Sequence, residues 1–72
     1  MSVTVRAEMV ASVHSVLVEA GQDIEVGDTL MILESMKMEI PVLCEDGGTL
    51  TEILVAKGDS VAEGQPLAVV AS

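Results

Sequence analysis

The 72-residue chain contains no Phe, Tyr or Trp, and only three of its residues are basic. Without aromatic rings it offers no surface on which the bases of a single strand could stack. With 12 acidic residues and a formal net charge of −9, it repels phosphate backbones and anionic lipid. The composition therefore excludes nucleic acid and membrane surfaces as partners.

Features of an exported or membrane-spanning protein are also missing. Cys44 is the single cysteine, so no disulfide can form within the chain, which is typical of cytosolic proteins. No apolar run approaches the length of a membrane span. Residues 1–11 lack the basic start and the long apolar stretch of a signal peptide. We therefore expect a cytoplasmic protein that is monomeric on its own.

What the chain does contain is Val, Leu, Ile, Met and Ala, which must build the core. These residues occur in short runs that favour strands over helices. Gly and Asp recur between the runs and indicate turns. A chain of this length is sufficient for one small domain. We interpret residues 1–72 as a single all-β domain.

An internal repeat organises the chain. Residues 13–35 align with residues 50–72 without a gap, each residue n with residue n + 37, as Gly21 does with Gly58 and Gly27 with Gly64. Such a period is typical of a duplicated supersecondary unit. The expected strands of the two halves are Val13–Val18, Thr29–Glu34, Leu50–Val55 and Leu67–Ala71.

Two such halves predict a flattened β-barrel or sandwich of two four-stranded sheets with pseudo-twofold symmetry. Alternation along the strands places Leu30 and Ile32 in one inward layer, together with Leu67 and Val69. The repeat mate of Lys37 is position 74, beyond the last residue. The hairpin around Lys37 and the chain termini are therefore expected at opposite ends of the domain.

A basic residue between two methionines marks this hairpin. The run is Glu34, Ser35, Met36, Lys37, Met38 and Glu39. One interpretation is a charged turn residue that separates two apolar strands. The other is a lysine presented for chemistry. Lys57 also lies in an expected turn but has no flanking methionine, and we interpret it as an ordinary surface residue.

The run and the repeat together resemble the biotinyl/lipoyl attachment domain family. Its signature is a lysine between two methionines, usually Ala-Met-Lys-Met, on a hairpin that joins two quasi-symmetric halves. In this chain Ser35 replaces the alanine, and residues 7–11 keep Met9 of a common Ala-Pro-Met-Pro-Gly segment but lack its prolines and glycine. The resemblance covers nearly the whole chain and is closest to small free-standing biotin attachment proteins and biotin carboxyl carriers.

The resemblance implies a barrel-sandwich hybrid fold and biotin attached covalently to Lys37 by a biotin protein ligase. It implies a non-catalytic carrier that moves a carboxyl group between the biotin carboxylase and carboxyltransferase subunits of a biotin-dependent carboxylase, with acyl-CoA carboxylation as the expected setting. Met36 and Met38 are the expected recognition residues beside the lysine. Candidate ligase contacts are Glu34, Ser35 and Glu39.

Two other functions stay open. One is a lipoyl carrier, although the lipoyl branch usually has Asp before the lysine and Ala after it. The other is an unmodified module for protein contacts. A free-standing enzyme is not expected, because His14 has no partner and no acid–base pair is evident. We expect no metal site either, because no His, Cys or clustered carboxylate stands at metal-ligand spacing from His14. Cys44 is expected at a small, part-buried position, and Pro41 on an edge strand or at a bulge.

Overall fold

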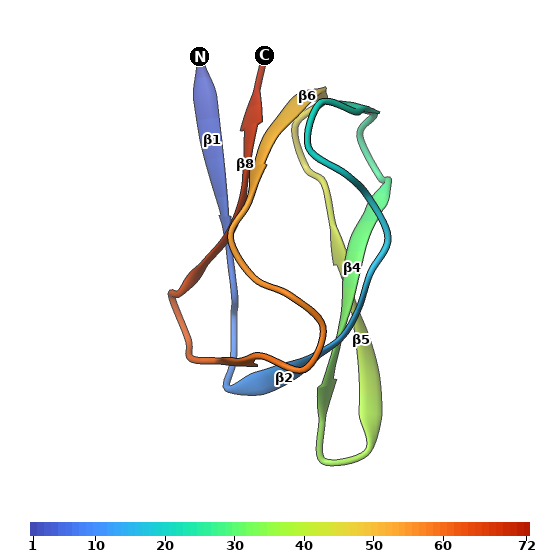
Figure 1. The fold of residues 1–72 in the computed structure, drawn as a ribbon, viewed down its shortest axis with the longest axis vertical. Helices are drawn as coiled ribbons and strands as arrows, with labels where there is room; N and C mark the ends of the chain where they lie inside the picture. The colour runs from blue at the N-terminus through green and yellow to red at the C-terminus, as the bar shows by residue number, and fades with distance from the viewer.

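Eight β-strands make up the regular structure of the chain in the computed structural model, which describes residues 1–72. They are β1 (Ser2–Arg6), β2 (Ala11–Val16), β3 (Asp23–Ile24), β4 (Thr29–Ser35), β5 (Met38–Leu43), β6 (Gly48–Ile53), β7 (Ser60–Val61) and β8 (Pro66–Ala71). Strands β1, β8, β6 and β3 form one antiparallel sheet, and β5, β4, β2 and β7 form the other (Figure 1). The predicted pair of four-stranded sheets is confirmed. No helix is present, hence none of a length and hydropathy suited to crossing a bilayer.

The pseudo-twofold relation holds strand by strand. Exchanging β1 with β5, β2 with β6, β3 with β7 and β4 with β8 converts the order of one sheet into the order of the other. The offset of 37 also relates β1 to residues 39–43 of β5, so the repeat is longer than the aligned segments. Each sheet contains strands from both halves of the chain. The halves therefore depend on each other for their sheet partners.

All four expected strands form, but their boundaries differ from prediction: β4 ends one residue later at Ser35, and β8 begins one residue earlier at Pro66. The strands expected at Val13–Val18 and Leu50–Val55 begin and end two residues earlier, as β2 and β6. A polar residue, Ser12 or Thr49, separates Ala11 and Gly48 from the expected strand starts, but Ala11 pairs with Val61 of β7 and Gly48 with Ile24 of β3. Pairing with a distant strand thus decides where these strands begin, and the local pattern of hydrophobic residues does not contain that information.

The core consists of two clusters of buried apolar side chains related by the same repeat. One contains Val13, Met31, Leu33 and Leu67, and the other contains their mates Leu50, Ala68, Val70 and Leu30. Complete burial of a leucine contributes about 1.5–3 kcal/mol to folding. This duplicated core has no aromatic residue to fill space, so close packing of aliphatic side chains holds the two sheets together.

The predicted inward layer is partly wrong. Leu30 and Leu67 are fully buried, but Ile32 and Val69 are only half-buried, while Met31 and Ala68 are fully buried. The pairing register of β4 with β5 shifts between Thr29 and Met31, and that of β8 with β1 skips residue 67. A bulge of this kind places two consecutive side chains inside the sandwich and reverses the later alternation.

The Lys37 hairpin and the chain termini lie at opposite ends of the molecule, as predicted. The β4–β5 hairpin projects from one end, and both termini lie at the other (Figure 1). The longest dimension of the domain is 33 Å. At the terminal end, the backbone N–H of Ser72 donates to the carbonyl of Met1 at 2.8 Å, and the N-terminal amine donates to the carbonyl of Ser72 at 3.1 Å.

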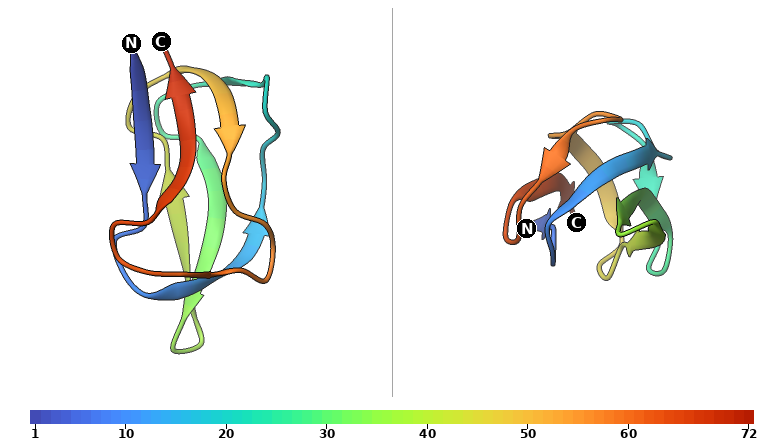
Figure 2. Two further views of the ribbon diagram at one scale, coloured as in Figure 1. Left: turned by 60° about the vertical axis from the view of Figure 1, so that its left-hand side comes forward. Right: turned by 90° about the horizontal axis from the view of Figure 1, so that it is seen from below.

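One side of the sandwich is open. Strand β1 is an edge of one sheet and β5 is an edge of the other, and these two edges do not pair. Seen from the hairpin end, the chain forms an arch whose opening lies between them (Figure 2). Pro41 lies on β5, so its expected position on an edge strand is confirmed.

Candidate functional site

Lys37 lies at the tip of a two-residue hairpin turn. Ser35 pairs with Met38, which leaves Met36 and Lys37 as the turn. Both have positive φ, 53° and 66°, and they are the only non-glycine residues in the chain that do. Two positive φ angles match the twist of the flanking strands, as in a type I′ turn, which normally selects Asn-Gly. A left-handed conformation costs about 1–2 kcal/mol for a residue with a Cβ. The tip is therefore strained by its own side chains.

The side chains at the tip extend into solvent. Met36 is 92% exposed and Met38 65% exposed, and Lys37 is exposed between them. No side-chain hydrogen bond or ion pair involves the Lys37 amine. Exposed apolar side chains that lie together in one patch often mark a contact with another molecule. The tip therefore presents a free primary amine flanked by two thioethers.

Acidic side chains occupy the strand pair next to the one that closes the turn. Glu34 and Glu39 occupy directly opposed positions on β4 and β5, and both are exposed. Like charges directly opposite each other destabilise a sheet. Ser35 is half-buried beside them. The hairpin thus brings all six site residues predicted from the sequence into one projecting element.

His14 and Lys57, to which we assigned no role, are both exposed. His14 is exposed and lies 3.5 Å from the Ser15 hydroxyl, and no group of three His, Cys, Asp or Glu side chains is arranged to hold a metal. Lys57 lies in an exposed turn in which Gly58, and not Lys57, has the positive φ, and the N–H of Ala56 donates to the Asp59 carboxylate at 2.9 Å.

Cys44 is more deeply buried than expected, with 2% of its surface exposed, and its thiol donates to the carbonyl of Asp46 at 2.6 Å. Its repeat mate Ala7 is 3% exposed. The two residues occupy equivalent small positions in the two core clusters.

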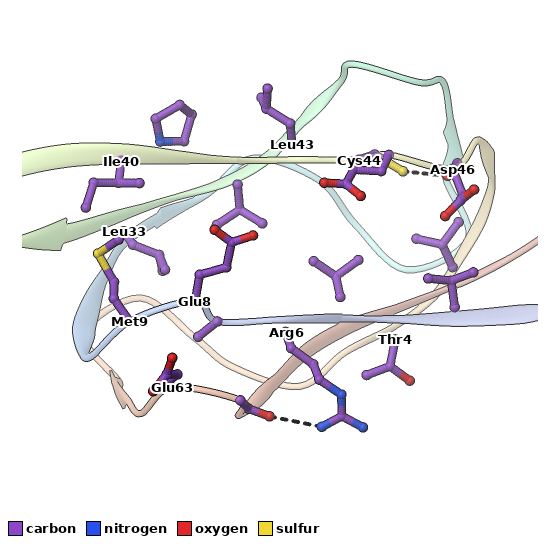
Figure 3. A pocket seen from close by; sticks show the side chains of 18 residues that line it. Thr4, Arg6, Glu8, Met9, Leu33, Ile40, Leu43, Cys44, Asp46 and Glu63 are labelled. Carbon is purple, nitrogen blue, oxygen red and sulfur yellow. Dashed lines mark hydrogen bonds between the residues drawn. The ribbon is translucent and has the colours of Figure 1, made fainter.

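Sequence reasoning missed a groove between β1 and β5. It has a volume of about 660 Å³ and runs along the open side of the sandwich (Figure 3). Val3 and Val5 of β1 and their mates Ile40 and Val42 of β5 line it. Extending the repeat to residues before Val13 reveals these pairs, and this signal could have identified the two edges.

Known proteins resemble this chain over nearly its full length. A family model described as "Biotin-requiring enzyme" matches residues 2–70. The biotinylated protein TB7.3 homolog of Mycobacterium leprae is 49% identical over 70 residues, which cover 97% of this chain and 99% of that protein. The biotin-dependent acyl-coenzyme A carboxylase alpha3 subunit of the same organism is 39% identical over 64 residues, which cover 89% of this chain and 11% of the subunit.

The fold recurs in a solved carboxylase. The crystal structure of Kluyveromyces lactis urea carboxylase contains a segment that superimposes with a TM-score of 0.92 at 28% sequence identity. The match covers 99% of this chain and 6% of that enzyme. The same small architecture thus occurs in a protein of similar length and within much longer chains.

Proposed function

The chain belongs to the biotinyl/lipoyl attachment domain family, and we propose that it is a biotin carrier with the cofactor attached to Lys37. The family resemblance predicted from the sequence is confirmed by the family model and by the related biotinylated protein. Biotin is the cofactor that both support. The assignment of Lys37 rests on the geometry of the hairpin.

The residues at the tip fit the chemistry of biotin attachment. The cofactor's carboxyl group forms an amide with a primary amine, so the amine must be accessible and free of competing partners. Lys37 meets both conditions on a short turn fixed by the paired strands β4 and β5. The observation that carries the proposal is this unpaired amine between two exposed methionines, at the end of the molecule farthest from the termini.

Amide formation also requires the amine to lose a proton, because free lysine amines are protonated at neutral pH. We infer that a biotin protein ligase accepts this proton and also holds biotin in an activated form, whose activating group leaves as the amide forms. Met36 and Met38 contact that ligase, with Glu34, Ser35 and Glu39 at the rim of the contact. Attachment removes one cation and changes the formal net charge from −9 to −10.

As a carrier, the domain does no catalysis itself. Biotin supplies a group that accepts and donates a carboxyl unit, and the domain brings it to a biotin carboxylase and then to a carboxyltransferase. A tether raises the local concentration of the cofactor at both enzymes without any new contact. The similarity to an acyl-coenzyme A carboxylase subunit supports acyl-CoA carboxylation as the setting. We place this work in the cytoplasm, with residues 1–72 as one monomeric domain.

Intact-mass measurement after incubation with a biotin protein ligase, ATP and biotin tests the proposal. The wild-type chain and Lys57→Arg gain the mass of one biotin, and Lys37→Arg gains none. Arg retains the charge but cannot form the amide under these conditions. Labelling of the Lys37→Arg chain would overturn the assignment. Modification by a lipoate ligase alone would establish the lipoyl carrier, and no modification by either ligase would support the unmodified interaction module.

A further inference from the structure

The groove between β1 and β5 straddles the pseudo-twofold axis. Apart from Glu63 and Gly64, all residues that line it form pairs at the repeat offset of 37, such as Val3 with Ile40 and Val5 with Val42. One half of the groove lies towards the hairpin, where Leu33 pairs with Ile40. The other half lies towards the termini, where Val70 pairs with Val3. Because duplication makes the two halves of the groove equivalent in backbone, a difference in side chain at equivalent positions shows which half better suits a given ligand.

The hairpin half is the more apolar of the two at its outer end. Met9 stands there, and its repeat mate in the terminal half is Asp46. Figure 3 shows the Met9 side chain extending from the segment after β1 towards Leu33 and Ile40. Met9 is 37% exposed, and methionine adapts its shape to whatever it contacts. At this outer position the hairpin half therefore offers a ligand an apolar contact where the terminal half offers a carboxylate.

A free hydrogen-bond acceptor lies beside this apolar surface. Glu8 is exposed, and its carboxylate points from the segment after β1 towards β5 (Figure 3). It takes part in no hydrogen bond of the structure, whereas Arg6, the last residue of β1, donates to the carbonyl of Gly64 at 2.9 Å. A carboxylate forms strong hydrogen bonds with neutral N–H donors. The hairpin half thus suits a ligand with an apolar body and an N–H group.

The group attached to Lys37 is within reach of this surface. Ile40 is three residues beyond Lys37 along β5, and a strand rises about 3.3 Å per residue, so the two Cα atoms are about 10 Å apart. The tether from the Lys37 Cα to the bicyclic ring contains about eleven bonds of roughly 1.5 Å, so its zigzag extends to about 14 Å. The ring can therefore lie on Ile40 and Met9 while it remains attached at the tip.

We propose that the biotinyl arm of Lys37 folds back into the hairpin half of the β1–β5 groove, where its ring packs on Met9, Leu33 and Ile40. An N–H of its cyclic urea donates to the Glu8 carboxylate. The volume of the groove is within the range of small-molecule sites. This site deepens the proposed function and rests on it, because it requires biotin on Lys37. It gives the cofactor a resting position on its own carrier between visits to the partner enzymes.

NMR spectra of the full chain before and after biotinylation test the proposal, with intact mass measured first. Absence of the mass gain would refute attachment itself, which is a separate result. In the biotinylated chain we expect nuclear Overhauser effects from the ring protons to the methyl groups of Met9, Leu33 and Ile40. Their repeat mates Val70 and Val3 in the terminal half serve as the internal control and show none.

Two variants sharpen the test. Met9→Asp gives the hairpin half the residue that the terminal half already tolerates, so the fold persists, and we expect the ring contacts to be lost. Asp46→Asn alters the terminal half instead and leaves the contacts unchanged. Chemical-shift changes confined to residues 35–39 of the biotinylated wild type would overturn the proposal. Ring contacts that persist in the Met9→Asp chain would also overturn it.

Discussion

The left-handed conformation of Lys37 leads to a prediction in which two similar substitutions have opposite effects on stability. Glycine adopts positive φ without a Cβ penalty. We therefore expect Lys37→Gly, at φ 66°, to stabilise the fold. We expect Lys57→Gly to destabilise it, because Lys57 has no such strain to relieve. Both residues are exposed, and both substitutions change the net charge to −10. Charge and lost burial are therefore matched between the two variants.

The magnitudes follow from two opposing effects. Relief of the left-handed strain at Lys37 contributes about 1–2 kcal/mol. The extra freedom of glycine in the unfolded chain costs about 0.5–1 kcal/mol, and this cost is the whole effect at Lys57. The net gain for Lys37→Gly thus lies between about 0 and 1.5 kcal/mol. At the middle of both ranges it is about 0.75 kcal/mol, which raises Tm by roughly 3–6 °C in a domain of this size. Lys57→Gly lowers Tm by a similar amount.

Thermal and urea unfolding followed by far-ultraviolet circular dichroism measure both variants on the same scale. Equal destabilisation by the two substitutions would refute the reasoning, because it would mean that the turn at Lys37 is unstrained. Labelling gives the functional counterpart. The more stable Lys37→Gly chain accepts no biotin, while the less stable Lys57→Gly chain accepts one. The lysine is then retained at the tip at a measurable cost in folding stability.

Three further predictions concern other parts of the fold. Gly48→Ala is expected to destabilise the domain by about 1–3 kcal/mol in urea unfolding, because the new Cβ would clash with the backbone oxygen of Ala71 on β8. Dilute peroxide is expected to oxidise Met36, which is 92% exposed, before Met31, which is fully buried. Peptide mass mapping of the folded chain measures both rates, and equal rates would contradict the exposure at the tip. Glu39→Lys replaces a repulsive pair with Glu34 by an attractive one, so unfolding should require about 0.2–1 kcal/mol more, and high salt should remove the gain.

Much of the architecture is contained in the sequence because the chain repeats itself. The offset that aligns Gly21 with Gly58 also relates the two sheets, and it correctly places the Lys37 hairpin opposite the termini. The six residues of the candidate site are contiguous in the sequence, so a hairpin was enough to bring them together. Local sequence pattern and the internal repeat were enough to predict these features.

Other features depend on contacts between distant strands. The bulge that buries both Leu30 and Met31 is fixed by how β4 pairs with β5, and alternation within β4 does not reveal it. The positive φ of Met36 contradicts its local preference, since type I′ turns favour Asn and Gly. The β1–β5 groove exists because two edges from different sheets face each other without pairing. Each of these features arises where tertiary structure overrides residue preference.

The hydrogen-bonded termini have a consequence for how the domain can be connected. By the repeat offset, Ser72 corresponds to Ser35 and Met1 corresponds to Met38, so the ends form a hairpin that lacks only its two turn residues. A Met-Lys linker from Ser72 to Met1 would produce a cyclic molecule. It would carry a second Ser-Met-Lys-Met tip at the end opposite the natural one. If a ligase recognises only the tip and the first strand residues, this ring would accept two biotins. If the ligase also contacts Glu34 and Glu39, whose repeat mates are Ala71 and Ser2, the cyclic molecule would accept one biotin.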